Sequence, residues 1–64
     1  MNIQYITSGR NGNDERVVLW RTGEYEYELD IGSGIHKKNV KFYGTEFNEA
    51  FEQFMSSIRN KRSI

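Results

Sequence analysis

The sequence predicts an α+β fold, in which an antiparallel meander of three or four strands is covered on one face by one C-terminal amphipathic helix. Two patterns support this prediction: apolar residues recur at intervals of three and four near the C-terminus, and they alternate with acidic residues in the middle of the chain. A chain of 64 residues without cysteine has room for one domain, residues 1–64, whose small core must depend on its many aromatic side chains.

Four segments have the composition or the alternation of strands. Residues 1–7 mix isoleucine and tyrosine with polar residues, and residues 16–22 form a β-branched and aromatic run. Residues 24–31 alternate without a break, so their apolar side chains share one face and their acidic side chains share the other. Residues 38–43 supply the fourth strand.

The connection between the first two strands, residues 8–14, is rich in glycine and asparagine. It lacks the spacing and the lysine of a P-loop, so a plain connecting loop is favoured over a phosphate site.

A short turn predicts how the second and third strands pair. A two-residue turn at Thr22-Gly23 would place Trp20 opposite Tyr25, and Val18 and Trp20 would then face the helix. The other side chains of that strand would lie on the acidic face: Val17, Leu19 and Arg21.

The turn after Ile31 predicts the pairing of the third and fourth strands. A loop of about four residues would oppose Asp30 to Lys37 and Glu26 to Lys41, which matches acid with base on one face.

Residues 45–60 are predicted to form the helix. Thr45 is the expected N-cap, and basic residues near the C-terminal end complement the helix dipole. The apolar face that this helix would turn toward the sheet consists of Phe47, Ala50, Phe51, Phe54, Met55 and Ile58.

The composition argues against several classes of function. Nine basic and nine acidic residues give no net charge, whereas general nucleic-acid binders carry a basic excess. His36, the single histidine, lies beside a glycine turn that is poor support for catalysis, so we expect neither an enzyme nor a metal or other cofactor. Residues 1–7 lack the features of a signal peptide and no long apolar run occurs, which indicates a cytoplasmic protein without a membrane association.

The acidic strand face is the most distinctive predicted surface, because one helix can cover only one face of a sheet. An apolar centre with a charged rim is typical of protein-binding surfaces, and a row of carboxylates can also imitate nucleic-acid phosphates. A solvated face partly neutralised by nearby lysines is the simpler alternative. The candidate partner-binding residues are Glu24, Glu26, Glu28, Asp30, Leu19 and Val17.

Two other hypotheses use different residues. A nucleic-acid-binding module would track phosphates with the basic residues of the fourth strand and the C-terminus, beside an exposed tyrosine. Its candidate residues are His36, Lys37, Lys38, Lys41, Tyr43, Arg59, Lys61 and Arg62. A homodimeric structural protein would instead pair through an edge strand or through the uncovered face.

A small cysteine-free chain with this strand-rich pattern and acidic face resembles the inhibitors that phages and mobile elements encode against host nucleases, including anti-CRISPR proteins. The resemblance lies in size, fold pattern and charge, and it assigns no role to any residue. It implies a non-catalytic inhibitor that binds a macromolecular partner in the host cytoplasm, such as a CRISPR nuclease.

Overall fold

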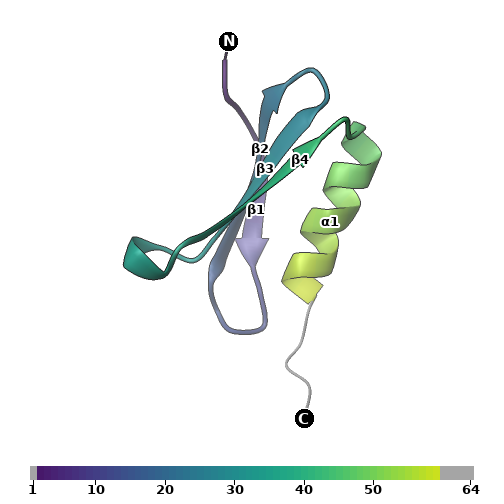
Figure 1. The fold of residues 1–64 in the computed structure, drawn as a ribbon. Coiled ribbons are helices and arrows are strands. Elements are labelled where there is room, and N and C mark those ends of the chain that lie inside the picture. Colours follow the sequence, from purple (N-terminus) through teal and green to yellow (C-terminus); the bar gives the residue numbers. More distant parts are fainter. Residues whose placement is uncertain (1, 60–64) are drawn as a thin grey trace.

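The structure, a computed structural model, describes residues 2–59 and confirms the predicted fold class. A four-stranded antiparallel sheet in the order β1-β2-β3-β4 carries one helix on one of its sides (Figure 1). The elements are β1 (Gln4–Arg10), β2 (Arg16–Gly23), β3 (Glu26–Ile31), the 3₁₀ helix η1 (Gly34–His36), β4 (Lys38–Tyr43) and α1 (Phe47–Arg59). No helix in this described part of the chain is long and apolar enough to cross a membrane.

The core lies between α1 and the central strands. Its fully buried side chains come from β2, β3 and α1: Val17, Leu19, Tyr27, Leu29, Ala50 and Phe54. The helix packs mainly on β2, and its C-terminal half also lies over Gly9 of β1. A Cβ atom on Gly9 would lie in ordinary van der Waals contact with Phe54 and Ile58, 3.5 Å from each.

The predicted pairing of β2 with β3 is wrong, and the error reverses the two faces of β2. Leu19 lies opposite Leu29, and Trp20 lies opposite Glu28, so Leu19 rather than Trp20 is under the helix. The turn is formed by Glu24 and Tyr25 instead of Thr22-Gly23, and the ladder is irregular at Thr22. An odd shift in register exchanges every side chain of a strand between its two faces.

The side chain of Arg21 holds this turn and explains its position. The guanidinium donates hydrogen bonds to the carbonyl oxygens of Gly23 (3.1 Å) and Glu24 (2.9 Å), and it lies 5.9 Å from the centre of the Tyr27 ring. Arg21 therefore packs on the helix side, and the prediction that it shares the acidic face is wrong.

The β3–β4 pairing also differs from the prediction, by two residues. Glu28 lies opposite Lys41 and Asp30 lies opposite Asn39, but an even shift leaves each side chain on its predicted face. Lys37 still forms an ion pair with Asp30 (3.4 Å), although it precedes β4.

A β-bulge at Ile6 sets the faces of β1. Tyr5 lies opposite Trp20 and Thr7 lies opposite Leu19, so Ile6 has no partner in β2 and packs against the core. The side chain of Tyr5 therefore shares the helix-free face with Trp20.

The start of α1 differs from the prediction. The Thr45 hydroxyl donates to the carbonyl of Tyr43 (3.3 Å), and its backbone N–H donates to Tyr25 (2.9 Å). The carbonyl of Glu46 accepts the first helical bond, and the Glu49 carboxylate accepts from the Glu46 N–H (3.3 Å). Thr45 therefore anchors the chain to the β2–β3 turn, and Glu46 occupies the N-cap position.

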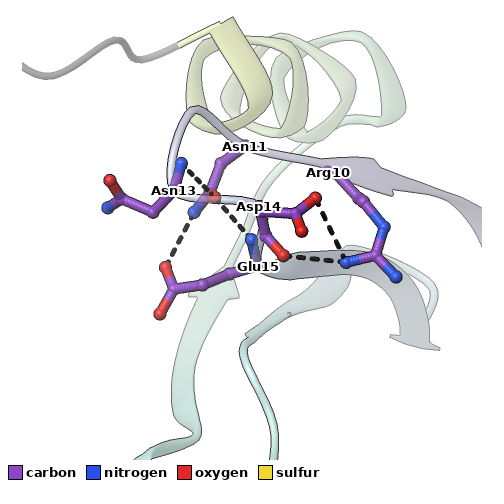
Figure 2. Close-up of polar contacts among 5 residues, drawn as sticks. All are labelled: Arg10, Asn11, Asn13, Asp14 and Glu15. Carbon is purple, nitrogen blue, oxygen red and sulfur yellow. Dashed lines mark hydrogen bonds and ion pairs between the residues drawn. The ribbon is translucent and has the colours of Figure 1, made fainter.

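The β1–β2 loop is organised by Asn11, whose side chain lies at its centre (Figure 2). Its amide oxygen accepts backbone hydrogen bonds from Asn13 and Glu15, both at 2.9 Å, and its amide nitrogen donates to the Glu15 carboxylate at 2.9 Å. Arg10 donates to the carbonyl of Asp14, which has a φ of 64°. The Asn11 side chain, with one donor contact and two acceptor contacts, thus adds to the backbone hydrogen bonds that Asn11 makes with Asp14 and Glu15.

The observed faces of β2 predict unequal costs for the same substitution at neighbouring valines. We expect Val17→Ala to lower the free energy of unfolding by about 2 kcal/mol, because the side chain is fully buried beneath α1. Val18→Ala should lower the free energy of unfolding by less than about 1 kcal/mol, because the Val18 side chain is only half-buried and lies on the face that α1 does not cover. Urea denaturation followed by circular dichroism measures both values, and equal costs would contradict the observed register.

The Asn11 contacts predict that Asn11→Asp weakens the fold. The new carboxylate would still accept the two backbone bonds, but it would face the Glu15 carboxylate and could not donate to it. The expected loss is about 1 kcal/mol, and the double variant Asn11→Asp/Glu15→Gln should recover most of it. Thermal unfolding tests this, with Asn13→Asp as the charge-matched control; failure of the second substitution to recover stability would contradict the contact.

Candidate interaction surface on the open sheet face

The face of the sheet opposite α1, here called the open face, presents an aromatic centre between charged side chains. Trp20 lies in a row that crosses all four strands, with Tyr5 on one side and Glu28 and then Lys41 on the other. The neighbouring row consists of Ser8, Val18, Asp30 and Asn39. Tyr43 lies opposite Glu26 near the β2–β3 turn and is 69% exposed.

Trp20 is fixed in its place by contacts on both sides. The Tyr5 ring meets it edge-on, with ring centres 5.8 Å apart and an angle of 76° between the planes. Its indole Nε1–H donates a hydrogen bond to Asp30 Oδ2 (3.1 Å). The hydroxyl groups of Tyr5 and Ser8 are also hydrogen-bonded to each other (2.9 Å). The aromatic centre is thus pre-organised for contact with another molecule, because its side chains already have defined orientations.

Asp30 and Glu28, two carboxylates of the open face, differ in how many hydrogen bonds and ion pairs they already form. Asp30 binds Trp20 and Lys37 through Oδ2 and accepts from Asn39 through Oδ1 (2.6 Å). Glu28 Oε1 accepts from the same Asn39 amide (3.1 Å), whereas Glu28 Oε2 has no hydrogen-bond partner among residues 2–59. Lys41 lies directly opposite Glu28 but forms no ion pair with it. Glu28 therefore keeps more free bonding capacity than Asp30.

Adjoining hollows surround Trp20 on this face. One, of about 310 Å³, is lined by Ile3, Trp20, Glu28 and Asp30. A second, of about 360 Å³, shares Trp20 and Asp30 and extends toward Val18, Arg16 and Lys37. A third, of about 350 Å³, shares Ile3 and Glu28 and extends toward Glu26, Lys41 and Tyr43. Side chains from all of these hollows can contact one bound partner.

The structure corrects half of the predicted partner-binding set. Val17 and Leu19 are completely buried under α1 and cannot contact a partner, because the register of β2 is shifted by an odd number of residues. Glu24 lies in the β2–β3 turn before β3 begins, away from the row of strand carboxylates. Glu26, Glu28 and Asp30 lie on the open face as predicted.

Sequence reasoning missed the aromatic centre. The sequence predicts Trp20 and Val18 beneath the helix and assigns Tyr5 to a strand without a face. The sequence of residues 16–22 is compatible with two arrangements, because four successive residues are apolar. Either Val17 and Leu19 are buried, or Val18 and Trp20 are. Only the turn position decides between them.

The basic residues of the nucleic-acid hypothesis do not form one patch. Lys37, Lys41 and Tyr43 lie at the open face, but Lys38 lies opposite Ile31 on the helix side. Arg59 ends α1, and His36 is exposed in η1. Lys61 and Arg62 lie outside the described residues. Two arginines that were not predicted, Arg10 and Arg16, lie opposite each other at the loop end of the open face.

The described residues contain no group of three or more His, Cys, Asp or Glu side chains that could hold a metal ion. The chain matches no protein-family model, no curated protein and no solved structure.

The contacts of Asp30 predict a measurable role in holding Trp20. Asp30→Ala would leave the indole N–H without its acceptor and the Asn39 amide with Glu28 as its remaining acceptor, and we expect a loss of about 1–2 kcal/mol in unfolding free energy. Lys37→Ala should cost under about 1 kcal/mol, since the exposed lysine can be replaced by water. Urea denaturation followed by Trp20 fluorescence measures the unfolding free energy of both variants. Equal losses would show that the Asp30–Lys37 ion pair, and not the hydrogen bonds of Asp30, accounts for its contribution to stability.

Proposed function

We propose that this protein is a non-catalytic binding protein that engages a macromolecular partner through the open face. The observation that carries the proposal is the aromatic centre formed by Tyr5 and Trp20, left uncovered by α1 and surrounded by charged side chains. Tryptophan and tyrosine contribute most to binding energy when they lie near the middle of an interface with a polar rim.

The charges of this face support a protein partner. Glu26 and Glu28 lie toward the β2–β3 turn, whereas Arg10 and Arg16 lie toward the opposite end of the same face. A mixture of signs across one face selects a partner with a complementary mixture and fixes its orientation. A uniformly charged ligand such as a nucleic acid would meet repulsion at one end.

The narrower hypothesis, inhibition of a nucleic-acid-handling protein such as a CRISPR nuclease, requires carboxylates that stand in for phosphates. Glu26 and Glu28 support it, but Asp30 is already engaged by Trp20, Asn39 and Lys37. We therefore base the proposal on the aromatic centre, and phosphate imitation stays a prediction. Homodimerisation also stays a prediction, and light scattering tests it.

The proposal predicts that partner capture depends on the open face. The immobilised full chain is used to capture proteins from a nuclease-treated lysate of the cells that produce it. Trp20→Ser and Tyr5→Ser should each reduce capture of the bound protein by about tenfold or more, because interface aromatics dominate affinity.

Tyr25→Ser is the matched control for Tyr5→Ser. Tyr25 is 55% exposed and Tyr5 is 53% exposed, but Tyr25 lies in the β2–β3 turn away from the aromatic centre. Equal capture by all variants would contradict the proposal. Capture from an untreated lysate that is lost from the nuclease-treated one, together with a salt-sensitive gel shift of an oligonucleotide, would favour the nucleic-acid hypothesis instead.

A further inference from the structure

We propose that the hollow lined by Ile3, Trp20, Glu28 and Asp30 receives an arginine side chain of the protein partner; this inference rests on the function proposed above. The hollow combines an indole ring with two carboxylates, whereas the two adjoining hollows formed by the described residues lack either the indole or one of the carboxylates.

The charge of the hollow requires a cationic guest. The charge of Asp30 is offset by its ion pair with Lys37, but Glu28 forms no ion pair within residues 2–59. Its Oε2 atom is also free of hydrogen bonds from those residues, so it can accept from a ligand without breaking a contact. A carboxylate or phosphate placed here would be repelled by the Glu28 carboxylate, which no ion pair within residues 2–59 offsets.

The indole ring adds a second attraction for a cation. Among aromatic amino acids, tryptophan has the ring face that binds cations most strongly. The orientation of the Trp20 ring is fixed by Tyr5 and Asp30. Ile3 supplies an apolar wall on which the methylene groups of a long basic side chain can pack.

Guanidinium fits this combination better than ammonium. Its planar group can stack on an indole while it donates parallel N–H bonds to a carboxylate, whereas the ammonium group of lysine is a compact, strongly hydrated charge. Glu28 has one oxygen with a single partner and one with none, which leaves room for such a paired contact.

The test is an NMR titration of the full chain with three blocked pentapeptides, Gly-Gly-X-Gly-Gly, in which X is arginine, citrulline or lysine. The chain has one tryptophan, so its single indole N–H signal reports on this site. Arginine peptide should shift this signal saturably at millimolar concentrations. Citrulline, which keeps the shape but lacks the charge, should not, and lysine should bind about fivefold more weakly.

Glu28→Gln should weaken arginine binding by about tenfold, because it removes a charge-assisted hydrogen bond. Glu52→Gln, an exposed change on α1 that removes the same charge, should leave it unchanged. The dispersion of the other amide signals verifies that each variant is folded.

Five results would overturn the inference: no saturable shift with the arginine peptide, equal shifts with arginine and citrulline, lysine binding as tightly as arginine, equal effects of the two glutamine variants, or a shift caused only by a single-stranded oligonucleotide. Failure of this inference can be distinguished from failure of the proposed function. If partner capture still depends on Trp20 while the arginine peptide does not bind, only the present inference fails. If capture is independent of Trp20, the proposed function fails.

Discussion

The register between β2 and β3 is the constraint on which the rest of the structure depends. With Leu19 opposite Leu29, one row of apolar side chains lies beneath α1, and the alternate row, with Val18 and Trp20, is left on the other side. A register shifted by one residue would bury Trp20 and expose Leu19. The Arg21 side chain contacts two turn carbonyls and the Tyr27 ring, and it thereby supports this register. The same contacts therefore bear on which side chains form the core and which lie on the open face.

Periodicity in the sequence is sufficient to predict the fold class, the two faces of β3 and the core of the α1 stripe, Ala50 and Phe54, whereas Phe47 and Phe51 of the predicted stripe are exposed. Alternation in β3 is unambiguous because every second residue is acidic, and the helix has one clear apolar stripe. The faces of β2 were not predictable in the same way, since Val17, Val18, Leu19 and Trp20 are all apolar. The turn is held by the Arg21 side chain through the carbonyls of Gly23 and Glu24, and the bulge places Ile6 against the core; neither follows from the alternation of apolar and polar residues.

The candidate site was predicted correctly in its charged part and wrongly in its apolar part. Glu26, Glu28 and Asp30 lie on the open face, but Trp20, Tyr5 and Val18 take the places predicted for Val17 and Leu19. This difference changes the chemistry of the surface. Instead of a row of carboxylates around two aliphatic residues, it presents a fixed indole with a partly unpaired glutamate beside it, so orientation and π interactions act together with charge.

The bulge at Ile6 also affects how the sheet meets other chains at its margins. β1 and β4 are the outer strands, and a flat outer strand offers unpaired backbone groups on which a further strand can add. The bulge bends β1, and Lys38 and Lys41 place charges along β4. Bulges and lysines on outer strands are features that disfavour the addition of a further strand, so both margins of this sheet are poor templates for polymerisation.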